Sequence, residues 1–98
     1  MAKLILRQEA IDDLTDIWGY SVRVWSEKQA DRYYEDIKQA CHQVALDPAI
    51  GREYTILKPG IFGLRVNKHF IFYQIVESGE VEVIRILHEK MDFQRHIV

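Results

Sequence analysis

The chain has few of the residues that would cross-link it, bind zinc or carry it through a membrane. It holds one cysteine, Cys41, so no internal disulfide can form, and a reducing, cytoplasmic setting is expected. Cys41 and four scattered histidines do not supply a cysteine-rich structural zinc site. No apolar run approaches the roughly 20 residues that span a bilayer, and the apolar part of residues 1–7 is too short for a secretory signal.

Positive charge is also scarce. The chain has 13 Lys and Arg against 15 Asp and Glu, a net charge of −2, whereas proteins that bind nucleic acid through its phosphates are usually basic. Direct nucleic-acid binding is therefore not expected. The charge is uneven, because residues 9–48 hold nine acids and four bases and residues 49–98 hold six acids and seven bases. One face can thus attract a partner of opposite charge.

Proline and glycine are concentrated in one stretch. Both prolines and three of the five glycines fall between residues 48 and 63, which indicates a connecting segment with some extended structure at residues 54–57. The apolar content of 48% is that of a globular protein. A chain of this length buries over about 60% of its unfolded surface, so we expect one folded domain over residues 1–98.

Apolar periodicity predicts a short strand and a helix at the start of the chain. The apolar run of residues 3–7 is too brief for a helix and is typical of a strand. From Glu9 the spacing changes to three and four, which predicts a helix with these large side chains toward the core: Ile11, Leu14, Trp18, Val22 and Trp25. Four acids are expected to interact with the positive end of its dipole: Glu9, Asp12, Asp13 and Asp16.

A second helix is predicted from its end signals. Ser26 and Gln29 form a capping-box pattern at its start, and Pro48 disfavours helix at Asp47. Cys41 lies on its apolar stripe and is expected to be a small core residue. Because the break between the two helices is short, they should form an antiparallel hairpin.

The second half of the chain predicts a small sheet. Residues 64–67, 70–76 and 81–87 are typical of strands, and Asn67-Lys68 and Ser78-Gly79 supply short turns that make neighbouring strands antiparallel. The last ten residues, from Glu89, suggest a short tail helix. The order β-α-α-β-β-β predicts an α+β fold, in which the helical hairpin packs on one face of a small, mostly antiparallel sheet followed by a C-terminal tail.

Several segments, taken together, resemble the RelE/ParE toxin superfamily. They are the first strand, the aromatic helix pair, residues 48–52 (Pro-Ala-Ile-Gly-Arg) and residues 63–65 (Gly-Leu-Arg) leading to Tyr73. Residues 84–92 (Ile-Arg-Ile-Leu-His-Glu-Lys-Met-Asp) resemble the ParE branch in particular. The similarity runs from about Ile5 to Ile97.

The resemblance implies the toxin of a type II toxin–antitoxin system, with growth inhibition and plasmid stabilisation as its roles. A ParD-like antitoxin would neutralise it in a heterotetramer or larger complex, and ParE-branch members poison DNA gyrase. We expect the target to be bound by the sheet and the C-terminal segment, through Arg85, His88, Lys90, Asp92 and Arg95. No catalytic residue, metal or cofactor is expected.

Aromatic residues gather in the helical hairpin and suggest where the antitoxin binds. Trp18 and Trp25 lie on the predicted core stripe, and burial is the default expectation for both. Two short helices on a small sheet can hardly cover every ring, however, and an exposed apolar patch usually marks a partner site. The candidate antitoxin contacts are Trp18, Trp25, Tyr33 and Tyr34.

Two other hypotheses place chemistry on the second half of the chain. The RelE branch cleaves mRNA on the ribosome, and Arg65 and His88 match the cation and the acid–base group that such cleavage needs. The simpler interpretation is that Arg65 pairs with an acid such as Glu82 or Asp92 and that His88 is a hydrogen-bonded strand end. In a helical tail, His88, Asp92 and His96 would share a face like metal ligands, but a solvated face is the simpler expectation.

Overall fold

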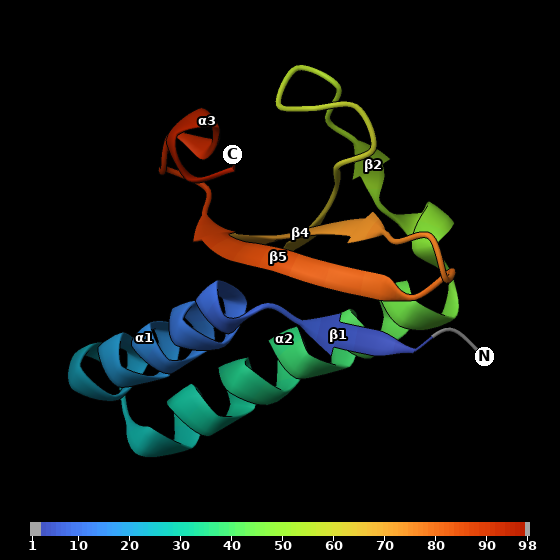
Figure 1. Ribbon diagram of the computed structural model, residues 1–98. Helices are drawn as coiled ribbons and strands as arrows, with labels where there is room; N and C mark the ends of the chain where they lie inside the picture. Colours follow the sequence, from blue (N-terminus) through green and yellow to red (C-terminus); the bar gives the residue numbers. More distant parts are fainter. Residues whose placement is uncertain (1–2, 98) are drawn as a thin grey trace.

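The computed structural model describes residues 3–97 and confirms the predicted α+β fold (Figure 1). The elements, in chain order, are β1 (Leu4–Leu6), α1 (Gln8–Val24), α2 (Glu27–Leu46), the 3-10 turn η1 (Pro48–Ile50), β2 (Arg52–Glu53), β3 (Phe62–Val66), β4 (His69–Ile75), β5 (Val81–His88) and α3 (Phe93–His96). None of the helices in this part of the chain has the length and apolar character needed to cross a bilayer.

The sheet has five strands in the order β1-β5-β4-β3-β2. β1 runs parallel to β5, with Leu4 opposite Val81, and the other three pairings are antiparallel. Both predicted turns are present: Asn67 has a φ of 55° and Gly79 a φ of 87°, the left-handed conformations that tight hairpins use. The sheet is therefore mostly antiparallel, as predicted.

Helices α1 and α2 form the predicted hairpin and cover one face of the sheet (Figure 1). Ser26 Oγ accepts a hydrogen bond from the Gln29 amide at 3.1 Å, so α2 starts at its predicted cap. It ends at Leu46, before Asp47 and Pro48. The core between hairpin and sheet includes Cys41, as expected, and centres on Ala10, Leu14, Ile37, Val44, Ile71, Tyr73, Val83 and Ile86.

The predicted core stripe of α1 is wrong by about one position. The buried residues of α1 are Ala10, Leu14 and Ser21, whereas Trp18 and Trp25 are 37% and 57% exposed. Small side chains let α1 lie close to its neighbours, and the Ser21 hydroxyl is satisfied there by donating to the Ile17 carbonyl at 2.8 Å. The expectation that both tryptophans are buried is therefore also wrong.

A second core covers the opposite face of the sheet. Buried Ile61, Phe72, Ile84, Leu87 and Ile97 form it, and Tyr54, Leu57, Phe70 and Phe93 pack against it. The extra strand β2 lies at Arg52–Glu53, just before the segment where extended structure was expected, and residues 55–57 form a turn instead. The chain turns there because the amides of Leu57 and Lys58 both donate to the Tyr54 carbonyl. The tail is helical only over Phe93–His96.

One of the four acids at the start of α1 does more than interact with the helix dipole. The Asp13 carboxylate accepts hydrogen bonds from Arg85 Nε and Nη2, each at 2.8 Å, and from the Ile86 amide at 2.9 Å. The hydrogen bonds that Arg85 donates to Asp13 raise the pKa of the Arg85 guanidinium. Because β1 ends opposite Val83, the rest of β5 has no neighbouring strand on that side. The Asp13 carboxylate takes the place of a strand there by accepting the hydrogen bond of the Ile86 amide.

Candidate functional site

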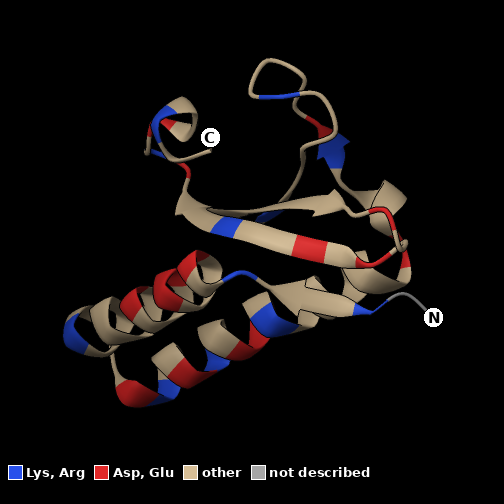
Figure 2. Ribbon diagram, in the orientation of Figure 1, with Lys and Arg blue, Asp and Glu red and all other residues tan. Residues whose placement is uncertain are grey.

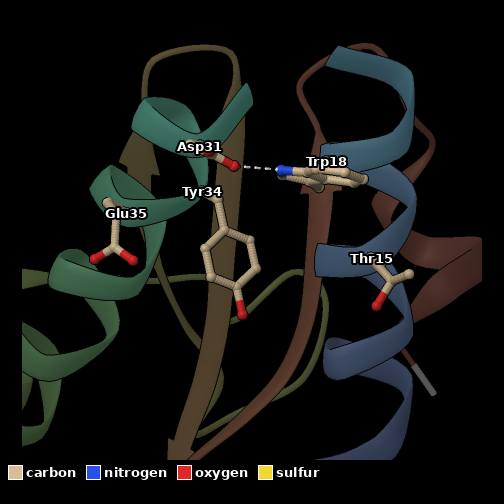
Figure 3. A pocket seen from close by; sticks show the side chains of 5 residues that line it. All are labelled: Thr15, Trp18, Asp31, Tyr34 and Glu35. Atoms are coloured by element: carbon tan, nitrogen blue, oxygen red, sulfur yellow. Dashed lines mark hydrogen bonds between the residues drawn. The ribbon is translucent and has the colours of Figure 1, made fainter. Parts of the chain in front are cut away.

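A hollow of about 520 Å³ lies between the two helices of the hairpin. Thr15 and Trp18 line it from α1, and Asp31, Tyr34 and Glu35 line it from α2 (Figure 3). The Trp18 indole donates a hydrogen bond to Asp31 Oδ1 at 2.8 Å, which joins the two helices across the hollow. The indole is therefore held in a fixed orientation although it is partly exposed.

A second hollow, of about 380 Å³, lies along α2 near the hairpin turn. Its lining residues are Trp25, Gln29, Arg32, Tyr33 and Asp36. Each of the four aromatic residues predicted to bind an antitoxin thus lines one hollow or the other. Their partial exposure places apolar rings where a partner can bury them, as aromatic anchors at protein interfaces are buried.

The two hollows share aromatic side chains and acidic groups. The first combines Trp18 and Tyr34 with the carboxylates of Asp31 and Glu35. The second combines Trp25 and Tyr33 with the carboxylate of Asp36 and the guanidinium of Arg32. The surrounding hairpin is rich in acidic residues (Figure 2). Such a surface favours a partner segment that presents apolar side chains flanked by Lys or Arg.

Tyr33 also reaches a cluster where α2 meets the ends of β4 and β5. Its hydroxyl hydrogen-bonds His69 Nδ1 at 2.5 Å, and the His69 ring stands edge-on to His88 with centroids 5.1 Å apart. Burial, with a further contribution from His88, lowers the pKa of His69 to about 4, while Glu89 and Asp13 oppose that shift. His69 is therefore neutral at physiological pH and ties the hairpin to the strand ends.

His69 makes the stability of the fold pH-dependent. Its folded pKa of about 4 is below its ordinary value of 6.5, so between these values the unfolded chain binds the proton first. The contribution of the neutral ring is complete above pH 6.5 and is lost as the pH falls toward 4. When the pH falls from about 7.5 to about 5, the free energy of unfolding should drop by about 1 kcal/mol less in His69→Gln than in the wild type. This value includes a reduction for solvent screening of the partly exposed ring.

Urea unfolding of both proteins at the two pH values measures this difference. His42→Gln, at an exposed position of α2, is the matched control and should keep the wild-type pH dependence. Equal pH dependence in His69→Gln and the wild type would contradict the assignment.

The structure does not bring Arg65 and His88 into one pocket. Arg65 lies on the face of the second core, where its guanidinium stands over the Phe70 ring at 5.7 Å. His88 lies on the hairpin side, against His69. The acid paired with Arg65 is Glu89, at 2.6 Å, not Glu82 or Asp92 as the sequence suggested. His88 accepts a hydrogen bond from the Lys90 amide at 3.1 Å, as a strand-end group does.

The predicted target-binding residues are divided between two faces. Arg85 is held by Asp13 at the start of α1, and His88 stacks on His69 on the hairpin side of the sheet. The other three, Lys90, Asp92 and Arg95, are exposed on the tail that covers the opposite face. Asp92 caps α3 by accepting from the Gln94 amide at 3.2 Å. The five side chains therefore form no single patch.

No group of three metal-ligating side chains occurs within residues 3–97. His88, Asp92 and His96 do not share a helical face, because the helix begins only at Phe93. Cys41 is 2% exposed, and burial raises the pKa of its thiol to about 12, so it packs as a small core residue.

The sequence analysis missed several residues of these sites. Asp31 lies three residues before Tyr34 and four before Glu35, a spacing that places all three on one side of α2. This spacing could have indicated from the sequence that carboxylates lie beside the Tyr34 ring. His69 carried no comparable signal. Its surroundings come from α2 and β5, which lie far from it in sequence.

Comparison with known proteins gives matches over nearly the whole chain. The family model described as ParE toxin of type II toxin-antitoxin system, parDE, matches residues 4–93. Toxin ParE1 of Mycobacterium tuberculosis is 30% identical over 96 residues, covering 98% of each chain. Toxin ParE1 of Caulobacter vibrioides is 32% identical over 92 residues, covering 94% of each chain.

A solved structure shows the same fold. It is described as the chromosomal ParDE TA system from P. aeruginosa and has a TM-score of 0.78 at 20% identity, covering 90% of this chain and 96% of that one. The matches place the chain in the class of type II toxin–antitoxin toxins. Within that class the chain belongs to the ParE toxin family, which confirms the resemblance seen in the sequence.

Proposed function

We propose that a ParD-like antitoxin neutralises this toxin in the cytoplasm by laying a basic, amphipathic segment over the helical hairpin. The observation that carries the proposal is the pair of hollows, each of which combines half-exposed aromatic rings with carboxylates. Apolar side chains of the segment would cover Trp18 and Tyr34, and a Lys or Arg would pair with Asp31 or Glu35. The complex is proposed to be a heterotetramer or larger.

The exposed tryptophan of the hairpin turn provides the test. Because Trp25 is 57% exposed, Trp25→Ala should change the free energy of unfolding by about 0.5 kcal/mol or less, as at other surface sites. Affinity for the purified ParD-like antitoxin should fall by about 2 kcal/mol, roughly 30-fold, as for an aromatic interface anchor. Thermal melts and calorimetric titration measure the two quantities.

Tyr20→Ala is the matched control, since Tyr20 is 56% exposed on the same hairpin but lines neither hollow. It should bind the antitoxin with near wild-type affinity. If Trp25→Ala melts far below the wild type, or if both variants bind equally well, the antitoxin site lies elsewhere.

We further propose that the toxin acts by binding and poisoning DNA gyrase. Membership of the ParE family supports this, together with the exposed tail residues Lys90 and Arg95, which supply positive charge on the face opposite the hairpin. A supercoiling assay with purified gyrase tests the target. Loss of supercoiling with accumulation of cleaved DNA is expected, and full supercoiling at excess toxin would exclude gyrase. The separation of Arg65 from His88 gives no support to the mRNA endonuclease alternative.

A further inference from the structure

The loop between β2 and β3, residues 54–61, holds an isoleucine in solvent. Ile56 is 79% exposed, the largest exposed fraction among the large apolar side chains of residues 3–97. The loop stands on the face of the sheet opposite the hairpin, on the same side as α3 (Figure 1). An apolar side chain so exposed is available for a partner protein to bury.

The loop is held in shape by its own hydrogen bonds. The Tyr54 amide donates to the Ile61 carbonyl at 2.8 Å, and the Leu57 amide donates to the Tyr54 carbonyl at 2.9 Å. Tyr54 and Leu57 also pack against the second core, and the Tyr54 ring meets Phe72 edge-on at 5.5 Å. Ile56 therefore projects from a fixed loop, and a partner that buries it pays little ordering entropy.

Positive charge surrounds the exposed isoleucine. Arg52 lies at the base of the loop and Lys58 within it, while the one acid nearby in sequence, Glu53, accepts a hydrogen bond from the Gly60 amide at 3.2 Å. Within residues 3–97, no carboxylate lies in ion-pair range of Arg52 or Lys58. Figure 2 shows both basic and acidic positions on β2 and the loop, on the face away from the hairpin.

The loop and the tail stand on the same face of the sheet (Figure 1). Tyr54 from the loop and Phe93 from α3 pack against the same second core, which fixes the two segments relative to each other. The tail adds exposed Met91 and Lys90 on the same face of the sheet. This loop–tail surface, residues 52–61 and 90–97, presents exposed Ile56 and Met91 and holds four bases against two acids, Glu53 and Asp92. It lies on the side of the sheet away from both antitoxin hollows.

We propose that this loop–tail surface contacts the cellular target, and that Ile56 inserts into an apolar notch of a protein whose rim is acidic. The inference rests on the proposed function, in which the chain acts by binding a macromolecule, but not on the identity of that macromolecule. A protein fits better than a nucleic acid, because a duplex or single strand would require a row of cations or stacking rings where the loop presents an aliphatic tip.

The test compares Ile56→Ser and Lys58→Glu with the wild type in a bacterial host that carries an inducible copy. Ile75→Ser, an isoleucine 49% exposed at the end of β4, is the matched control for lost apolar surface, and Lys3→Glu is the control for reversed charge. The inducer concentration that halves the growth rate is measured for each. Thermal melts and neutralisation by the coexpressed ParD-like antitoxin are measured in parallel.

We expect each loop variant to require at least tenfold more inducer than the wild type, with unchanged melting temperature and unchanged neutralisation, while both controls behave as the wild type. Growth arrest by Ile56→Ser at wild-type inducer levels would overturn the proposal. It would also be overturned if Ile75→Ser lost growth arrest to the same extent as Ile56→Ser. If only Lys58→Glu loses growth arrest, and it also loses binding to a DNA duplex, the proposal would be overturned in favour of phosphate recognition.

The gyrase proposal fails in a different way. If gyrase is the wrong target, wild-type toxin leaves supercoiling intact, yet the loop variants still lose growth arrest. If the loop is wrong, the wild type and Ile56→Ser inhibit purified gyrase equally. A wild-type chain that does not slow growth would remove both proposals.

Discussion

Asp13→Ala should lower the free energy of unfolding by about 3 kcal/mol, because it breaks a largely buried ion pair and removes a cap from a strand edge. Asp13 accepts two hydrogen bonds from Arg85 and one from the Ile86 amide, and the two ionic side chains are 13% and 21% exposed. Without the carboxylate, the Arg85 charge and the Ile86 amide would both lack a partner. Urea denaturation at neutral pH measures the loss.

Asp12→Ala is the matched control for this prediction. Asp12 is exposed on the same turn of α1 and accepts only from the Gln8 side chain, so its loss should cost about 0.5 kcal/mol or less. Arg85→Met combined with Asp13→Ala should recover part of the loss, since it removes the unpaired charge. If the two aspartate variants unfold at the same urea concentration, Asp13 acts only through the helix dipole, as the sequence suggested.

Gly51→Ala should destabilise the fold by about 3 kcal/mol or more, through steric overlap and the loss of two partly buried hydrogen bonds. A Cβ at Gly51 would lie 2.1 Å from the Tyr73 hydroxyl. That hydroxyl accepts from the Gly51 amide at 3.0 Å and donates to the Pro48 carbonyl at 2.6 Å, and Tyr73 itself is fully buried. The φ of Gly51, −82°, suits any residue, so backbone strain does not contribute.

Gly19→Ala provides a control of opposite sign. Gly19 lies inside α1 with no atom nearer than 3.9 Å to its added Cβ, so alanine should stabilise the helix by up to about 1 kcal/mol. Combining Gly51→Ala with Tyr73→Phe should cost less than the sum of the two single changes, because phenylalanine removes the oxygen that the new methyl group meets. Strict additivity in thermal melts would contradict the steric explanation.

The sequence predicted the elements that depend on local signals. The Ser26 cap, the end of α2 before Pro48 and the turns at Asn67 and Gly79 were all recognisable, because a few adjacent residues determine each of them. The order of elements was enough to predict the hairpin on a sheet. The aromatic residues lining the hollows were named as well, since four rings in a small hairpin exceed what it can bury.

Features that depend on distant partners could not be predicted from the sequence. The period of α1 fits either Trp18 or Ile17 toward the core, and only the close approach of the sheet and α2 favours Ala10, Leu14 and Ser21. The ion pair of Asp13 joins residues 72 apart in the sequence. Arg65 and His88 were paired as a cation and an acid–base group on two strands of the predicted sheet, but the alternation of side chains puts them on opposite faces.

The parallel pairing of β1 with β5 delays completion of the fold during synthesis. Leu4 can pair only after Val81 has been made, and Asp13 of α1 bonds Arg85 and Ile86, which follow Val81 in the chain. The apolar first strand of an emerging chain therefore stays unpaired until nearly all of the chain has left the ribosome. A nascent or prematurely terminated product lacks β5, the strand that pairs with both β1 and β4. The folded toxin therefore exists only once the polypeptide is nearly complete, because its first strand is paired by one of its last.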